Sequence, residues 1–379
     1  MLSIPARLGL VVVPVTLIQL LLAVAPASLT PRSQLPTAAP VLTNLRASAA
    51  ALPDLRSLIV VRHGQVLGDY YALRVRPDGL ANIKSASKSI IAMLVGIAIE
   101  RRLIPDVKQP ISTYFPELMK DADVRKRAIT IEDLLTMRSG LESTSGENYG
   151  QWVKSPNWVR FALRQPIVSE PGTAMQYSTG SSHLLSAILT RVSRTDTWQF
   201  AQNALFTPLG LRLARWPRDP QGIYFGGNEM LMTPRQMVVI GELHLNRGRF
   251  KDRQIVPAEW VETSCVPRTT SVWDSERHYG YGWWVQRFGR HTACFAWGFG
   301  GQYIFVFREL DLVIVATSSP AVSEERRGHR RRLFDLIERE VLARLDVNVQ
   351  SSVGSRQSTV DSLQSTVFSL QSTVRAKHR

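Results

Sequence analysis

Segments that are typical of β-strands lie at the two ends of the globular part of this 379-residue chain, and helix-like segments lie between them. Residues 58–61 and 65–71 flank Arg62-His63-Gly64 and predict a β-hairpin. Four β-rich stretches with turn residues between them run from about residue 278 to 319 and predict an antiparallel meander. An early hairpin and a late meander can share one sheet if the helices form an insertion. We therefore predict an α+β fold, with an antiparallel sheet flanked by helices.

The predicted domain boundaries follow from this arrangement. We assign residues 42–102 and 278–346 to the sheet domain, which ends in an amphipathic helix over residues 333–345. Residues 103–277 form the inserted helical domain. One of its helices is expected to begin at Pro234, because Thr233 is a favourable N-cap and proline is favourable at the first helical position.

Three further segments lie outside these domains. Residues 1–27 resemble an export signal, because Arg7 precedes an apolar run that ends in small residues. We therefore expect a periplasmic or extracellular protein, although an uncleaved membrane anchor stays open. Residues 28–41 read as a linker. Residues 347–379 hold a Ser- and Thr-rich heptad repeat, which favours a low-complexity, disordered tail over a coiled coil.

Charge, cysteines and histidines narrow the possible partners. The formal charge is +15, but the basic cluster at residues 326–332 lacks interleaved aromatic residues, so we expect a solvated helix start and no nucleic acid. An exported protein could join Cys265 and Cys294 in a disulfide, but nothing in the sequence places them together, and we expect two separate buried thiols. The seven histidines show no metal-binding spacing, so neither a metal nor a cofactor is expected.

Ser85 and Lys88 stand at the head of an apolar segment that predicts a helix from residue 85 to about 101. Their spacing would put both side chains on one helix face, about one turn apart. A lysine there could take up or favour loss of the serine proton, which a weakly nucleophilic hydroxyl needs. Ser87 and Ser89 would point elsewhere. A capping serine with a solvent-reaching lysine is the alternative that this pair alone leaves open.

With these residues the sequence resembles the serine β-lactamase and penicillin-recognising superfamily, which combines Ser-x-x-Lys with two later motifs. The resemblance is strongest to class C-like serine hydrolases, including esterases and 6-aminohexanoate-dimer hydrolase-like proteins. It implies a β-lactamase-like fold and covers residues 58–345. The stretches that carry it are "IKSASKSIIAMLVGIAIERRLI", "ITIEDLLTMRSGL", "PGTAMQYSTGSSHLLSAIL", "GGNEMLMTPRQM" and "AWGFGGQYIFV".

The second motif of the superfamily is Tyr-x-Asn, and its match here is Tyr177-Ser178-Thr179. The resemblance makes Tyr177 a proton shuttle or base, and a nearby Lys88 cation would favour the phenolate and lower its pKa. Thr179 stands where asparagine is expected and lacks the fork of an amide, which affects substrate recognition. Tyr149 is a rival tyrosine, which we keep as a substrate contact.

The third motif lies on the strand beside the active site, and its match here is Ala296-Trp297-Gly298, followed by Phe299. Gly298 would let a substrate lie against the strand. The resemblance implies that the backbone N–H groups of Ser85 and Phe299 form the oxyanion hole, which stabilises the charge that develops during acyl transfer. A glycine bulge on an inner strand is the structural alternative.

The substrate expectation depends on what the third motif lacks. Ala296 stands where family members that prefer carboxylate-bearing substrates often carry lysine or histidine. We therefore expect short esters or simple amides to be cleaved and β-lactams to react slowly. Trp283, Trp284 or Trp297 could form the wall of an acyl pocket, and at least two of the three are expected to be core residues.

These motifs lead to one main functional prediction and two rivals. The main prediction is a metal-free serine hydrolase that cleaves small esters, amides or peptide-like substrates through an acyl-enzyme. Ser85 would be the nucleophile, and Lys88 and Tyr177 would transfer its proton. The first rival is a β-lactamase or D-alanyl-D-alanine carboxypeptidase, and the second is a non-catalytic penicillin-binding-like module. Membrane contact is expected only through the N-terminal segment, and the sequence does not define the oligomeric state.

Overall fold

The early hairpin and the late strands form one antiparallel sheet in the computed structural model, which describes residues 42, 44–321 and 326–347. The strand order is β2-β1-β12-β11-β10-β9-β8-β7. Leu58 of β1 faces Ala316 of β12, so the hairpin pairs directly with the last strand. The predicted α+β fold is confirmed. The strands are β1 (Leu55–Arg62), β2 (Gln65–Tyr71), β7 (Thr269–Ser271), β8 (Asp274–Tyr279), β9 (Trp284–Phe288), β10 (His291–Gly298), β11 (Gln302–Phe307) and β12 (Leu312–Ser318).

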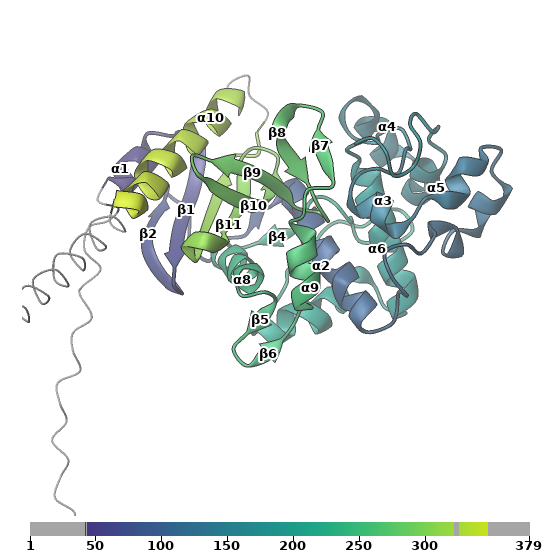
Figure 1. Cartoon of the computed structure of the whole chain (residues 1–379), viewed down its shortest axis with the longest axis horizontal. Coiled ribbons are helices and arrows are strands. Elements are labelled where there is room, and N and C mark those ends of the chain that lie inside the picture. Colours follow the sequence, from purple (N-terminus) through teal and green to yellow (C-terminus); the bar gives the residue numbers. More distant parts are fainter. Residues whose placement is uncertain (1–41, 43, 322–325, 348–379) are drawn as a thin grey trace, which may run out of the picture. The chain divides into compact units, whose positions relative to one another are not determined.

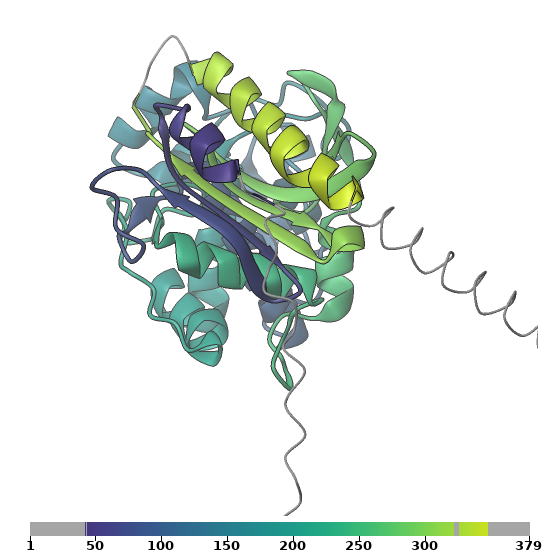
Figure 2. The same cartoon turned by 90° about the vertical axis from the view of Figure 1, so that its left-hand side faces the viewer.

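Helices cover both faces of this sheet (Figures 1 and 2). On one face lie α1 (Leu45–Ala50) and α10 (Arg326–Leu336), which continues as a π-helical segment over Ile337–Leu342. On the other face α2 (Ser87–Glu100) contacts β10 and α8 (Pro234–Leu245) contacts β11 and β12. Successive residues of a strand point to opposite faces, and β1 accordingly divides its side chains between two cores: Leu58 and Val60 on the α10 side, Ile59 and Val61 on the α2 side.

The segment between β2 and β7 is mainly helical. It holds α3 (Ile131–Leu135), α4 (Tyr149–Lys154), α5 (Trp158–Leu163), α6 (Thr179–Ser193), α7 (Thr197–Ala201), α8 and α9 (Ala258–Ser264). Two small sheets pair β3 (Ala81–Asn82) with β4 (Leu231–Met232), and β5 (Arg249–Phe250) with β6 (Arg253–Gln254). Short 3-10 or π-helical turns occupy Lys84–Ala86, Ile111–Thr113, Pro116–Lys120, Val124–Ala128, Gly146–Asn148, Gln202–Phe206, Thr207–Leu209 and Arg308–Leu310.

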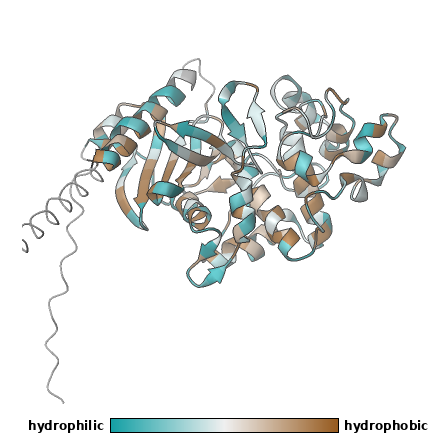
Figure 3. Cartoon of the chain, in the orientation of Figure 1, coloured by the Kyte–Doolittle hydropathy of each residue, from teal (hydrophilic) through white to brown (hydrophobic). Residues whose placement is uncertain are grey.

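The observed elements differ in two ways from the domain boundaries suggested by the sequence. The late strands start at Thr269, earlier than residue 278, and α8 packs on the sheet although it comes from the inserted segment. The predicted signal segment, the linker and nearly all of the tail lie outside the described residues. In the described part of the chain, none of the helices combines the length and the apolar character that a membrane crossing needs. Figure 3 shows hydrophobic residues along the central strands, whereas the β5–β6 hairpin is largely hydrophilic.

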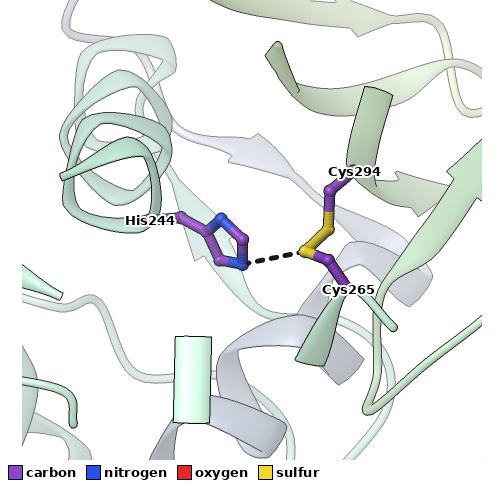
Figure 4. A group of neighbouring side chains, drawn as sticks. All are labelled: His244, Cys265 and Cys294. Atoms are coloured by element: carbon purple, nitrogen blue, oxygen red, sulfur yellow. Dashed lines mark hydrogen bonds between the residues drawn. A yellow bond between two sulfur atoms is a disulfide. The ribbon is translucent and has the colours of Figure 1, made fainter. Parts of the chain in front are cut away.

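Cys265 and Cys294 form a disulfide, so the expectation of two separate thiols was wrong. The pairing depends on the position of Cys265, which follows α9 and lies against β10, with the two Cα atoms 5.8 Å apart. Figure 4 shows His244 of α8 beside the bond, with its Nε2 atom 3.4 Å from the Cys265 sulfur. Burial lowers the pKa of His244 to about 3, so the imidazole is neutral. The bonded sulfurs offer no thiolate, which a metal-binding cysteine must provide.

Candidate active site

Ser85 lies in a tight turn that leads from β3 into α2. Lys84, the residue before it, has a left-handed backbone with φ of +50°, which is uncommon for a residue with a side chain. Two side-chain contacts hold this conformation: Lys84 Nζ lies 2.8 Å from Glu229 Oε1, and the Lys84 N–H donates to Asn82 Oδ1 at 3.0 Å. Such backbone conformations often occur at functional sites, where the surroundings compensate for their cost. The turn therefore fixes Ser85 at the start of the helix.

Lys88 points back from the first turn of α2 and is only 3% exposed. Its Nζ atom contacts three oxygens: Gly227 O at 2.7 Å, Ser85 Oγ at 3.1 Å and Thr179 Oγ1 at 3.3 Å. No carboxylate of the described residues lies within ion-pair distance of it. Burial lowers the pKa of Lys88 to about 7, because the charged form loses its hydration. Near neutral pH, this amine can therefore accept a proton from Ser85.

The neighbouring serines, Ser87 and Ser89, form hydrogen bonds to backbone carbonyls and not to Lys88. Ser87 donates its hydroxyl proton to Lys84 O at 2.5 Å, and Ser89 donates to Gly282 O at 2.6 Å. Both side chains are buried. Among the three serines of this stretch, only Ser85 contacts Lys88 and faces the cavity described below.

Tyr177 lies on the other side of Ser85, within a cluster of aromatic rings. Its ring stacks on Trp284 at 5.7 Å and meets the edge of Trp273 at 5.5 Å. Burial raises the pKa of Tyr177 to about 12, and the hydrogen bond with Ser85 opposes this shift only in part. Although Lys88 lies 5.0 Å from the ring centre, the expected lowering of the Tyr177 pKa was wrong, because burial of the phenol raises it. A neutral Tyr177 can donate a hydrogen bond to the serine oxygen or to a leaving group.

Thr179 begins α6 and lies behind the cavity, since it is 4% exposed and contacts Lys88 directly. In front of it lies Ser145, whose hydroxyl is 2.9 Å from Thr179 Oγ1 and which lines the cavity. Ser145 was not predicted from the sequence. It has no spacing relation to the three motifs, and only the folding of its loop against α6 brings it to the site.

The end of β10 lies against the Ser85 turn. A Cβ atom on Gly298 would come within 2.1 Å of Ile83 O, so only glycine permits this close approach. Gly298 therefore fixes the position of β10 relative to Ser85, which sets where the Phe299 backbone lies. Trp297 lines the cavity, whereas Trp283 is fully buried against His244 and Trp284 supports Tyr177. Two of the three tryptophans are thus core residues, as expected.

Tyr149 begins α4 and contacts Asn228. Its hydroxyl oxygen accepts a hydrogen bond from Asn228 Nδ2 at 2.9 Å, and burial raises its pKa. It has no hydrogen bond with Ser85 or Lys88 and does not line the cavity. That Tyr149 contacts the substrate stays a prediction.

The cavity in front of Ser85 has a volume of about 700 Å³. Five of its twelve lining residues are Phe, Tyr or Trp, and α10 contributes His329 and Arg330. Arg330 lies 5.5 Å from the Trp297 ring and has no carboxylate of the described residues within ion-pair distance. The basic cluster is therefore more than the solvated helix start that we expected, and the cavity holds a cation despite Ala296. The lining residues are Ser85, Ser145, Gly146, Tyr177, Trp273, Trp297, Phe299, Gly300, Gly301, Tyr303, His329 and Arg330.

Comparisons with known proteins agree with this architecture. The 6-aminohexanoate-dimer hydrolase of Paenarthrobacter ureafaciens is 24% identical over 331 residues, which cover 77% of this chain and 82% of the relative. The D-amino acid amidase of Ochrobactrum anthropi SV3 shares the fold, with a TM-score of 0.62, 17% identity and coverage of 78% of this chain and 99% of the amidase. EstCE1, described as a hydrolase with promiscuous acyltransferase activity, also shares the fold. Its TM-score is 0.65 at 18% identity, and the match covers 79% of this chain and 98% of EstCE1. The Beta-lactamase family model matches residues 49–338, and the chain therefore belongs to the beta-lactamase family of hydrolases.

Proposed function

We propose that the protein is a metal-free serine hydrolase that cleaves small esters or amides through an acyl-enzyme at Ser85. The observation that carries this proposal is the buried Lys88, whose amine lies 3.1 Å from Ser85 Oγ and has a pKa of about 7. Structural lysines are seldom buried without a charged partner. A general base is most effective when its pKa lies near the working pH, so the burial of Lys88 suits the chemistry.

The geometry supports one order of proton transfers. Neutral Lys88 takes the Ser85 proton as the serine oxygen attacks the substrate carbonyl carbon, and the N–H groups of Ser85 and Phe299 stabilise the developing oxyanion. Tyr177 is a neutral phenol at this pH and donates its proton to the leaving atom. The Lys88 ammonium then returns a proton to Tyr177. Water then attacks the acyl-enzyme with Lys88 again as base, which releases the acid and restores Ser85.

The aromatic cavity and the relatives support the substrate class. The rings of Tyr177, Trp273 and Trp297 suit an apolar acyl group or leaving group. One relative is named as a 6-aminohexanoate-dimer hydrolase and one structural neighbour as an amidase. Arg330 supports a second candidate, a β-lactamase or D-alanyl carboxypeptidase, because a guanidinium in the cavity can bind the carboxylate of such substrates.

We also propose that the protein is exported. The N-terminal segment carries this proposal, and the Cys265–Cys294 disulfide supports it, since such bonds persist mainly in oxidising compartments.

The test is the intact mass after treatment with a fluorophosphonate and, separately, with a penicillin. We expect one adduct on the wild-type chain and none on Ser85→Ala. Ser193→Ala is the matched control, because this serine bonds only to Thr195 at the surface and should keep full labelling. Ser87→Ala is a poor control, since Ser87 holds the catalytic turn. A wild-type chain that forms no adduct would favour the non-catalytic module.

A further inference from the structure

A histidine and an aspartate form a buried pair behind the active site, and the proton path proposed for Ser85 does not use them. The side chains of His183 and Asp219 are both 0% exposed, and His183 Nε2 lies 3.0 Å from Asp219 Oδ2. The imidazole is surrounded by aromatic rings, those of Trp152, Trp158 and Phe225. A buried carboxylate is costly even when it is paired, so this pair adds little stability that apolar side chains would not also provide.

The hydrogen bonds fix the tautomer of His183. The Gly226 N–H donates to His183 Nδ1 at 3.3 Å, and a backbone N–H can only donate. Nδ1 therefore carries no proton, and the ring proton lies on Nε2, from which it is donated to Asp219. The other carboxylate oxygen, Asp219 Oδ1, accepts from the N–H groups of Gln221 and Ile223. Both oxygens of Asp219 thus accept, and they hold the imidazole in the one tautomer that can accept from Gly226.

Gly226 connects this pair to Lys88. The next residue, Gly227, directs its carbonyl oxygen to Lys88 Nζ at 2.7 Å, which is the shortest of the three oxygen contacts of that amine. Both glycines lie directly on their neighbours. A Cβ atom on Gly226 would come within 2.3 Å of Ser182 O in α6. A Cβ atom on Gly227 would come within 3.1 Å of Lys88 Nζ. A short chain of contacts therefore runs from the buried pair to the amine of Lys88.

We propose that His183 and Asp219 are positioning residues for the reaction, which hold the backbone at Gly226 so that the next carbonyl oxygen stays on the amine of Lys88. This inference rests on the proposed function, because it assumes that Lys88 is the base. A carbonyl oxygen bonds more strongly to an ammonium than to a neutral amine, so it favours the charged form and opposes the effect of burial. The pair thereby keeps the amine basic enough to take up the serine proton near neutral pH.

Asp219→Asn tests this chain of contacts with almost no change of shape. The asparagine amide keeps one oxygen for the two loop N–H groups and presents its NH₂ group to His183. His183 must then accept at Nε2 and carry its proton on Nδ1, where it meets the Gly226 N–H. Two donors face each other, and the Gly227 carbonyl should move away from Lys88.

The measured quantity is the pH midpoint of the rate constant for fluorophosphonate labelling of Ser85. A hydrogen bond to a charged group shifts an equilibrium by about 10- to 150-fold. Loss of the carbonyl contact should therefore lower the midpoint in Asp219→Asn by about 1 to 2 pH units from the wild-type value near 7. The plateau rate should also fall, because the amine is then a weaker base.

A second variant and a control accompany Asp219→Asn. In His183→Gln the amide can still donate to Asp219 but offers no acceptor at the position of Nδ1, so the midpoint should fall in the same way. His244→Gln is the matched control, because His244 is also 0% exposed but contacts Ser264 and Cys265 rather than the Gly226 backbone. This control should lower the melting temperature without moving the midpoint.

The possible failures can be told apart. A merely structural role of the pair predicts a lower melting temperature and an unchanged midpoint in both Asp219→Asn and His183→Gln. That result, or a midpoint that rises, refutes the positioning role. If the wild-type chain is not labelled, the proposed function fails, and amide hydrogen exchange then decides about the contacts alone. The Gly226 N–H should exchange faster in Asp219→Asn than in the wild-type chain, and equal rates refute the inference.

Discussion

The pKa of Lys88 predicts how the reactivity of Ser85 depends on pH. An exposed lysine has a pKa of 10.5, and burial lowers this one to about 7. At pH 8 the neutral fraction of the amine is then about 0.9, compared with about 0.003 for an exposed lysine. Burial thus makes the base about 300-fold more available. Above pH 8 almost no further gain is expected, because the amine is already neutral.

The assay is the second-order rate constant for fluorophosphonate labelling of Ser85, measured by mass between pH 5 and pH 10. We expect the rate to fall about tenfold for each pH unit below 7 and to reach a plateau above pH 8. Tyr177 as the base would give a different curve, since its pKa of about 12 requires the rate to rise through pH 10 without a plateau. Such a continuous rise, or a rate that does not change over the whole range, would refute the assignment of Lys88.

A histidine in the cavity has to be excluded as the source of the pH dependence. His329 is 2% exposed, and burial lowers its pKa below 6.5. His329→Gln is therefore the control, and it should keep the midpoint near pH 7. If this variant loses the pH dependence, His329 and not Lys88 controls the reaction.

Three further predictions concern the site and the tail. Lys88→Met and Tyr177→Phe should each lower kcat by about 10²- to 10⁴-fold. The loss in the double variant should be much smaller than the product of the two single losses, because both residues serve one proton path. A loss equal to that product would show that they act independently. Arg330→Ala should lower kcat/KM for a chromogenic cephalosporin by about 10- to 150-fold and for p-nitrophenyl butyrate much less, as expected for a lost charged hydrogen bond; equal losses would exclude carboxylate binding. Truncation after Asn348 should leave activity and the melting temperature unchanged, and a fall of several degrees would show that the tail packs on the core.

Features set by local spacing or by long patterned segments could be predicted from the sequence. The three-residue spacing of Ser85 and Lys88 brings them together where the 3-10 turn Lys84–Ala86 leads into α2. The sheet followed from the early hairpin and the late meander, which can share one sheet if the helices between them form an insertion. The contact between Ser85 and Lys88 and the fold class therefore required no knowledge of distant contacts.

Features that depend on contacts between distant segments could not be predicted. Ser145 reaches the site through hydrogen bonds to Thr179, 34 positions away, and Arg330 does so because α10 packs near Trp297. The pKa of Tyr177 was predicted to be lowered, but it is raised. The sequence shows the nearby lysine but not the aromatic rings that desolvate the phenol. In each case the missing information was the environment, which exists only after folding.

The burial that lowers the pKa of Lys88 must also cost stability, and the cost depends on pH. The pKa is about 7 in the folded chain and 10.5 in an exposed lysine, so between these values the unfolded chain binds the additional proton. Stability should therefore rise with pH through this window and be lowest below pH 7. Lys88 therefore changes the free energy of unfolding by about −5 kcal/mol at pH 6 and by about −2 kcal/mol at pH 9, and the negative sign means that it destabilises the fold.

Lys88→Met removes this contribution, because methionine has no charge to desolvate. The loss of the hydrogen bonds to Gly227 and Thr179 costs the same at both pH values, so the difference between the two measurements isolates the charge. The measured quantity is the free energy of unfolding of the variant minus that of the wild-type chain, from denaturant titrations. This difference should be about 3 kcal/mol more positive at pH 6 than at pH 9. Lys84→Met is the matched comparison: Lys84 has an ion pair with Glu229, so its removal should give no such gain at low pH. An effect of Lys88→Met that is the same at both pH values would mean that the amine keeps an ordinary pKa when buried, and the base would then have to be sought elsewhere.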